Sequence, residues 1–362
     1  MVNYIDLFIA LFISMIVSYL STFLVKKFAV KVGAVDFPNY RKIHTKVTPR
    51  LGGLAIFIGA FAGGLYLQPN HTYLYPILFG ALVILLTGAL DDKYSLKPLI
   101  KLSGQLIAAA IVVWAGITIE RVTLPFFGII EFNPFFGIFI TVLWIVGITN
   151  AINLIDGLDG LATGVTTIAL ISIFIMSLID SQLFVALLCI VLVGANLGFL
   201  PHNFYPAKIY MGDAGSNFLG FMIAVISIVG LFKEVAFFSF IIPVIVLAIP
   251  IFDTLVAIVR RWYNNESIMM ADNKHIHYQL IQAGYSHRKT VLIIYAFSAL
   301  FGILAILFSY STTLISLIIT FFVIFGLHVI AELAGIVMGG KRPVVSLIRK
   351  GLRKLRRRKR SN

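Results

Sequence analysis

Long apolar segments recur along the chain, and they constrain the fold more than any other feature of the sequence. Crossing the hydrocarbon core of a bilayer takes a helix of about 20 mainly apolar residues. Segments near that length follow one another from residue 4 to residue 338, separated by polar stretches. Of all residues, 60% are hydrophobic and 12% are charged, whereas soluble domains carry about 25% charged residues. The sequence therefore predicts an all-α, polytopic integral membrane protein.

The apolar pattern predicts about 11 transmembrane helices. Their connections alternate between two sides of the membrane, and none is longer than about thirty residues, so no separate soluble domain fits. We expect one transmembrane domain over residues 1–338 and a basic tail over 339–362. The predicted spans cover residues 4–25, 51–67, 74–90, 99–118, 135–150, 161–179, 183–200, 216–232, 235–258, 290–310 and 312–338.

Basic residues divide unevenly between the two sides. The chain has 29 Lys and Arg residues, and only Arg121 and Lys233 fall in connections on one side. Lys and Arg concentrate in cytoplasmic loops, so the basic side is predicted to be cytoplasmic. The N-terminus is then outside, the C-terminus is cytoplasmic, and the expected location is the plasma membrane.

The tail KRPVVSLIRKGLRKLRRRKRSN contains no acidic residue. Near anionic lipid, each Lys or Arg contributes about 1 kcal/mol of attraction, so binding to the inner leaflet is the favoured role. The net charge of +14 is also typical of proteins that bind nucleic acid. Membrane orientation already accounts for this charge, and we expect no nucleic-acid partner.

Every polar cluster of the sequence falls on the predicted cytoplasmic side. A transporter needs polar groups at the midplane or along a path across the membrane. Here the few ionisable groups within spans, such as Lys101 and Asp253, lie near cytoplasmic ends. This favours an enzyme over two alternatives, a flippase for lipid-linked sugars and a non-catalytic scaffold. The clusters are RKIHTKVTPRLGG (41–53), LDDKYSLK (90–97), NAINLIDGLDGLA (150–162), HNFYPAKIYMGDAGS (202–216) and DNKHIHYQL (272–280).

Three aspartates follow or precede apolar segments directly. Ionising both Asp91 and Asp92 at a membrane edge is costly unless a divalent cation or a lysine such as Lys93 lies near. A solvated helix end would explain this pair equally well. Asp213 lies in the Gly-flanked stretch MGDAGS, where small residues let a ligand approach the backbone. An ordinary turn aspartate is the alternative reading.

The stretch NAINLIDGLDGLA carries Asn150, Asn153, Asp156 and Asp159 at steps of three residues. On a helix, such steps place the first three side chains on one broad face. Their oxygens suit hydroxyls, base N–H groups or Mg²⁺. Helix capping accounts for one such residue at a time, so four together indicate a site.

Basic and histidine residues complete the set. His275 and His277 suit a phosphate or a metal, although a solvated loop is the alternative and no nearby Cys or further His supports zinc. Lys46 belongs to a basic loop that is either an anion-binding surface or only an orientation signal. Carboxylates, amides and cations on one membrane face are the groups that phosphoryl transfer needs, since positioning and charge neutralisation do most of its catalytic work.

These motifs resemble those of the polyprenyl-phosphate N-acetylhexosamine-1-phosphate transferases, from RKIH at 41 to HIHY at 275–278. The resemblance implies transfer of a sugar 1-phosphate from a UDP-sugar to a polyprenyl phosphate. It also implies release of UMP and Mg²⁺ as the cofactor, with Mn²⁺ as the alternative ion. One transmembrane domain would present five cytoplasmic loops to the site. A homodimer is compatible with the sequence.

The details are similar to the branch that transfers GlcNAc-1-phosphate, which implies UDP-GlcNAc and undecaprenyl phosphate as substrates and wall teichoic acid as the polymer begun. PAKIYMGDAGS, PIFDTLVAIVRR and HIHY carry this likeness. The alternative is the phospho-MurNAc-pentapeptide transferase of peptidoglycan synthesis, which usually has three consecutive histidines in its last loop and lacks the FDT segment.

The resemblance also implies a role for each matched residue. The branch usually reads HIHH, and Tyr278 replaces its last histidine, so Tyr278 is not among the expected site residues. The implied catalytic residues are Asp91, Asp92 and Asp213, of which Asp213 and Asp92 would bind the metal. The implied substrate-binding residues are Lys46, Lys93, Asn153, Asp156, Asp159, Asn203, His275 and His277.

Overall fold

The structure is a computed structural model that describes residues 3–37, 47–124, 128–230, 241–267 and 274–334. Within these residues, eight helices are long and apolar enough to cross a membrane. Two further apolar helices, α2 (Gly52–Leu67) and α4 (Pro98–Trp114), are shorter. The eight are α1 (Tyr4–Val32), α3 (Leu74–Tyr94), α5 (Pro134–Ile155), α6 (Leu161–Ile179), α7 (Leu183–Asn203), α8 (Gly212–Gly230), α12 (His287–Ser309) and α13 (Thr313–Ala334).

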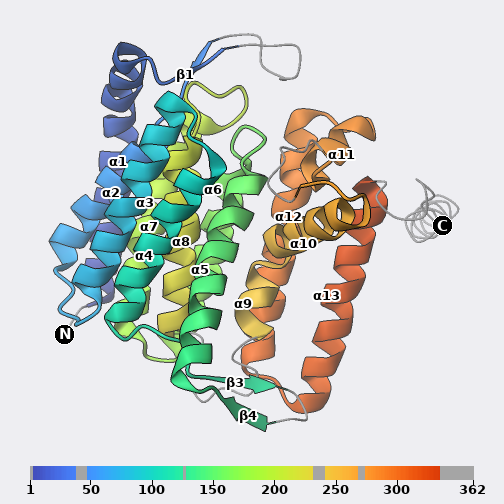
Figure 1. The fold of residues 1–362 in the computed structure, drawn as a ribbon. Helices are drawn as coiled ribbons and strands as arrows, with labels where there is room; N and C mark the ends of the chain where they lie inside the picture. Colours follow the sequence, from blue (N-terminus) through green and yellow to red (C-terminus); the bar gives the residue numbers. More distant parts are fainter. Residues whose placement is uncertain (1–2, 38–46, 125–127, 231–240, 268–273, 335–362) are drawn as a thin grey trace, which may run out of the picture.

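The helices stand side by side in one bundle (Figure 1), which confirms the mainly helical, polytopic class. The helices α7 and α8 lie at its centre. In the most apolar 18-residue stretch of each helix, 78% and 83% of the residues are buried, against 33% for α1 and α13. Around them, α1 and α2 pack on α7, while α3 and α5 pack on α8. The total of eleven spans and the orientation of the termini stay predictions.

Two small antiparallel hairpins depart from the all-α expectation. One pairs β1 (Val35–Asp36) with β2 (Thr48–Pro49), and the other pairs β3 (Arg121–Leu124) with β4 (Gly128–Glu131). Both lie in connections that the sequence analysis treats as loops. Strands this short carry too weak a pattern to be recognised from the sequence.

The segment predicted as one span over 235–258 is divided in the structure. The short helix α9 (Ile241–Val246) ends one residue before Leu247 caps the next helix, and α10 (Ala248–Tyr263) then runs at a steep angle to α12 and α13 (Figure 1). Pro250 lacks the N–H that would donate to the carbonyl of Val246, so one hydrogen bond of the helical pattern is missing where the two helices separate. A further short helix, α11 (Ile276–Gln282), follows.

The loops that carry the polar clusters meet at one end of the bundle, the upper end in Figure 1. The β1–β2 hairpin, the α5–α6 turn, the α7–α8 loop and α11 lie there, whereas the start of α1 and the β3–β4 hairpin lie at the opposite end. Segments far apart in the sequence therefore form one polar region. The predicted basic tail, 339–362, lies outside the described residues.

The helices α2 and α8 approach closely at this end. The N–H groups of Gly52 and Gly53 donate to the carbonyls of Tyr210 and Met211 at 3.0 and 2.9 Å. A Cβ added at Gly53 would collide with the backbone of Gly215. Glycine at position 53 therefore lets the residues that lead into α8 pack directly on the start of α2.

We predict that Gly53→Ala lowers the melting temperature of the purified protein in detergent. Packing too much volume against a rigid backbone costs about 1–3 kcal/mol. Gly64→Ala is the matched control, because a Cβ at that helical position meets no atom within 4 Å. Equal melting temperatures for the two variants would contradict the close contact between α2 and α8.

Candidate active site

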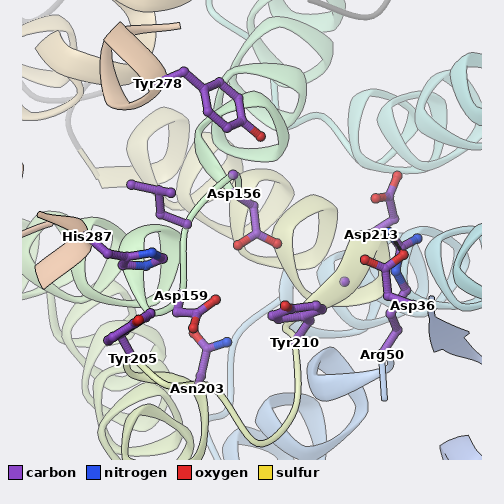
Figure 2. Close-up of a pocket in the computed structure, with 13 residues that line it drawn as sticks. Asp36, Arg50, Asp156, Asp159, Asn203, Tyr205, Tyr210, Asp213, Tyr278 and His287 are labelled. Carbon is purple, nitrogen blue, oxygen red and sulfur yellow. Dashed lines mark ion pairs between the residues drawn. The ribbon is translucent and has the colours of Figure 1, made fainter. Parts of the chain in front are cut away.

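A polar cavity of about 250 Å³ opens at this end of the bundle (Figure 2). The β1–β2 hairpin, the α5–α6 turn, the α7–α8 loop and the starts of α8 and α12 all contribute to its wall. The lining residues are Asp36, Arg50, Asp156, Gly157, Leu158, Asp159, Asn203, Tyr205, Tyr210, Gly212, Asp213, Tyr278 and His287.

The four polar residues of the α5–α6 stretch have two different functions. Asn150 and Asn153 face neighbouring helices: Asn150 Nδ2 donates to Gln105 Oε1 at 2.8 Å, and Asn153 Nδ2 donates to Ser216 Oγ at 2.9 Å. Asp156 and Asp159 follow the end of α5 and line the cavity. Asn153 also contacts the carboxylate of Asp213, so it supports the site from α5, while the turn beyond presents Asp156 and Asp159.

The turn itself is held by bonds to distant segments. Asp159 Oδ2 accepts the N–H of Ala207 at 2.9 Å, and the Tyr295 hydroxyl of α12 donates to the carbonyl of Gly160. Gly160 has φ of 78°, a left-handed conformation that favours glycine. These contacts fix the turn between α5 and α6.

Asp156 has a strongly perturbed pKa. Burial raises the pKa of its carboxyl to about 8, and the negative charges of Asp213 and Asp92 add to the effect. At neutral pH the free protein therefore holds Asp156 mainly protonated. A bound cation beside it would favour the ionised form.

Asp92 connects α3 to the first turn of α8. Its two carboxylate oxygens accept the N–H groups of Asp213 at 2.9 Å and Ala214 at 3.1 Å. The first N–H groups of a helix lack partners within it, and a carboxylate there is further stabilised by the helix dipole. Gly212 has φ of 70°, and a Cβ at this residue would collide with the Asp92 carboxylate, which explains the glycine in MGD.

Asp91 has different partners, although it is the neighbouring residue. Lys101 Nζ of α4 lies 3.0 Å from Asp91 Oδ2 and also pairs with Asp213. One turn further along α4, Gln105 Nε2 donates to Asn217 Oδ1 at 3.2 Å. Lys101 thus offsets the repulsion between two carboxylates that belong to different helices.

The lysine that neutralises these carboxylates is not the one expected. Lys93 is exposed, and its Nζ lies 4.7 Å from the centre of the Tyr94 ring. Lys46 lies outside the described residues. Lys101 is predicted from the sequence to lie near a cytoplasmic helix end, and its spacing of four from Gln105 is the signal that both share one helix face.

Asn203, the last residue of α7, lines the cavity as expected. Its Oδ1 accepts the Thr163 hydroxyl at 2.6 Å, and its Nδ2 donates to the carbonyl of Ile209 at 3.1 Å. Because both ends of its side chain are bonded to protein groups, Asn203 mainly fixes the loop that leads into α8.

The two histidines lie behind the cavity wall and are not among its lining residues. His275 Nδ1 lies 2.9 Å from Asp253 Oδ2, and both side chains are buried. His277 is 1% exposed and packs against Gly157, and neither of its ring nitrogens has a hydrogen-bond partner among the described residues. Burial lowers the pKa of His277 to about 3, so its ring is neutral.

Tyr278, absent from the expected site, does line the cavity (Figure 2). Burial raises the pKa of its phenol, and the negative charge of Asp156 acts in the same direction. Arg50, Tyr205, Tyr210 and His287 were likewise not expected there. The sequence offers little signal for them, because single aromatic or basic residues in loops are common.

The available donors fit a hard divalent cation that binds together with its substrate. In the described part of the chain, no three His, Cys, Asp or Glu side chains are arranged to hold a metal ion. Mg²⁺ is usually held by one or two carboxylates with waters and substrate phosphates. Asp213 and Asp156, which both line the cavity, suit that mode. Asp92 already has both oxygens engaged with backbone N–H groups.

Comparison with known proteins identifies the family. A family model described as glycosyl transferase family 4 matches residues 74–231. A Bacillus subtilis (strain 168) protein named "Probable undecaprenyl-phosphate N-acetylglucosaminyl 1-phosphate transferase" is 43% identical over 333 residues, which cover 91% of this chain and 92% of that protein.

More distant relatives carry similar names. A Mycolicibacterium smegmatis "Decaprenyl-phosphate N-acetylglucosaminephosphotransferase" is 35% identical over 77% of this chain and 76% of its own length. An Escherichia coli (strain K12) "Undecaprenyl-phosphate alpha-N-acetylglucosaminyl 1-phosphate transferase" is 30% identical over 80% of each chain. This chain belongs to glycosyl transferase family 4. The resemblance found in its motifs is thereby confirmed.

The pKa of Asp156 predicts a pH-dependent stability. An unfolded Asp has a pKa of about 3.9 and the folded value is about 8, so the folded state binds more protons between these values. The wild-type protein therefore loses stability as pH rises through this window. Asp156→Asn removes the ionisable group, so the melting temperature of the variant minus that of the wild type should increase from about pH 5 to about pH 8.

A difference in melting temperature that does not change with pH would contradict the raised pKa. Asp180→Asn, at the other end of the bundle, is the control.

Proposed function

We propose that this protein transfers GlcNAc-1-phosphate from UDP-GlcNAc to undecaprenyl phosphate, giving undecaprenyl-diphospho-GlcNAc and UMP. The names of its relatives support both the sugar and the lipid. The observation that carries the proposal is the cluster of Asp91, Asp213 and Lys101 beside a polar cavity at one end of the membrane helices. A lipid phosphate and a water-soluble nucleotide can meet at such a place.

The reaction exchanges one phosphoanhydride for another. An oxygen of the lipid phosphate attacks the phosphorus that carries GlcNAc, the bond to the UMP phosphate breaks, and UMP leaves. The lipid phosphate is already largely ionised at neutral pH, so the site needs little general-base catalysis. Since one anhydride is broken and one is made, we expect an equilibrium near unity that added UMP can reverse.

The residues of the cluster then have distinct tasks. Asp213 presents a carboxylate at the cavity, and Lys101 holds Asp91 and Asp213 close together despite their like charge. Asp92 fixes the first turn of α8, which positions Asp213. Asp156 and Asp159 lie where hydroxyl and base N–H groups of the nucleotide-sugar can donate to them.

Mg²⁺ would be held by Asp213 with Asp156 and the substrate phosphates, and it supplies neutralisation of the negative charge on the diphosphate and on departing UMP. Positioning of the two phosphates is left to the protein. Such preorganised charge is usually the largest contribution to phosphoryl transfer.

The cellular setting belongs to the same proposal. The excess of Lys and Arg in connections on one side supports a cytoplasmic active site in the plasma membrane. The product would begin a cell-envelope polymer such as wall teichoic acid, and the basic tail would bind anionic lipid of the inner leaflet.

A transfer assay tests the function directly. Membranes or purified protein receive labelled UDP-GlcNAc, undecaprenyl phosphate and Mg²⁺. We expect label to pass into butanol, to return to water when UMP is added, and to stay in water with EDTA. Faster transfer from UDP-MurNAc-pentapeptide run in parallel would refute the choice of sugar. Absence of transfer from either nucleotide would refute the reaction.

Asp213→Asn should abolish transfer while the protein still folds and inserts. The substitution keeps the size of the side chain but removes the charge that would bind the cation. Initial rates over a Mg²⁺ titration provide the measurement, and Asp180→Asn, at the opposite end of α6, is the matched control. Wild-type turnover by Asp213→Asn at saturating Mg²⁺ would exclude the metal role.

Lys101→Met should lower kcat by about 100-fold, because loss of its charge leaves Asp91 and Asp213 to repel each other and displaces Asp213 from its position in the site. Lys93→Met removes the same charge from an exposed side chain and should change kcat little. Measuring kcat for both variants compares Lys101, which pairs with the aspartates in the structure, with Lys93, which the sequence suggested. A larger loss in Lys93→Met would contradict the structural assignment.

A further inference from the structure

The cavity wall contains many carboxylates and little positive charge. Asp36, Asp156, Asp159 and Asp213 line it, and Arg50 is the only Lys or Arg among the lining residues that the structure describes. Lys101 already pairs with two carboxylates and does not line the cavity. The ionised carboxylates of this wall repel an entering phosphate unless cations accompany it. Among the residues that the structure describes, Arg50 is therefore the cation at the cavity surface.

The backbone at Arg50 is held from both sides. The Arg50 N–H donates to the carbonyl of Ala34 at 2.9 Å, and the carbonyl of Pro49 accepts the N–H of Tyr210 at 2.9 Å. The next residue, Leu51, is buried and has φ of 76°, an unfavourable conformation for a residue with a Cβ. Such strain persists only where the surroundings enforce it, and it clusters at functional sites. The fold therefore fixes the position from which Arg50 reaches the cavity.

The Arg50 guanidinium is only partly engaged by the protein groups that the structure describes. Its Nη2 lies 3.2 Å from Asp36 Oδ1, and its Nη1 lies 4.0 Å from Asp92 Oδ1, too far for a hydrogen bond. The side chain is 30% exposed, whereas that of Asp36 is 11% exposed. A guanidinium has five N–H donors in a planar fork. Donors thus remain for an anion in the cavity.

We propose that Arg50 binds the diphosphate of the nucleotide substrate and that Asp36 occupies its guanidinium until the nucleotide arrives. This inference rests on the proposed function and assigns a residue to one part of its substrate. Arginine matches phosphate oxygens with two parallel hydrogen bonds, which a lysine cannot reproduce. Asp36 competes with the phosphate for the same fork, so it keeps Arg50 ordered at the cost of some nucleotide affinity.

The nucleotide is favoured over the lipid phosphate as the partner of Arg50. The cavity is polar, and Arg50 shares it with Asp159 and Tyr210, which suits a water-soluble ligand. Lys101 of α4 instead contacts Asp91 near the end of α3 and does not line the cavity. Arg50 lines the cavity where the nucleotide would bind, whereas Lys101 is already engaged by Asp91 and Asp213.

Binding measurements with two ligands test the proposal. Isothermal titration of the purified protein in detergent with fixed Mg²⁺ compares UDP, which has the diphosphate, with uridine, which has none. Arg50→Ala should weaken UDP binding by about tenfold or more and leave uridine binding unchanged, and Arg50→Lys should fall between. Asp36→Asn should strengthen UDP binding several-fold, and the gain should vanish when Arg50→Ala is added. Lys289→Ala, which removes an exposed cation near the same end of α12, is the control.

Several results would overturn the proposal. These are unchanged UDP binding in Arg50→Ala and Arg50→Lys, an equal loss for UDP and uridine, and weaker UDP binding in Asp36→Asn. In the transfer assay, a raised KM for undecaprenyl phosphate alone would assign Arg50 to the lipid instead. Failure of the wild-type protein to bind UDP or to transfer GlcNAc-1-phosphate would refute the proposed function, whatever the variants do. If Arg50→Ala does not fold, UDP binding by Arg50→Lys and Asp36→Asn still tests the proposal.

Discussion

The geometry of the site depends on the carboxylate of Asp92. It accepts two N–H groups from the first turn of α8, and its side chain is fully buried. These two hydrogen bonds fix the end of α3 against the start of α8, so that Asp213 lies at the cavity. A carboxylate is well suited to this task, because it satisfies helix N–H groups that lack internal partners and interacts favourably with the helix dipole. Everything that Asp213 binds is positioned through this contact.

Two adjacent aspartates consequently differ in chemistry. Asp92 has both oxygens occupied by backbone N–H groups of α8, whereas Asp91 accepts the backbone N–H of Leu96 at one oxygen and contacts Lys101 at the other. Successive residues on a helix point about 100° apart, so neighbours in sequence meet different helices. Asp92 therefore fixes the start of α8, and Asp91 holds the side chain of Lys101.

The sequence predicts the membrane helices well, because their apolar composition is set by the bilayer and not by their neighbours. It also identifies two polar stretches, 150–162 and 202–216, whose residues line the cavity. It does not predict which residue of a stretch faces the cavity. Asn150 and Asn153 bond to other helices, His277 is buried behind Gly157, and Lys101 and not Lys93 meets the aspartates. These choices depend on contacts between helices, which spacing along one chain does not record.

The excess of carboxylates around the cavity has a consequence for inhibitor design. Four aspartates and one arginine are among the described residues that line this space, so a companion cation would favour the entry of a nucleotide. A small molecule that replaces the diphosphate with a positively charged linker would pair with the aspartates directly and would not need the metal. Compounds of that kind should retain potency under chelation, which would distinguish them from substrate analogues that copy the phosphate charge.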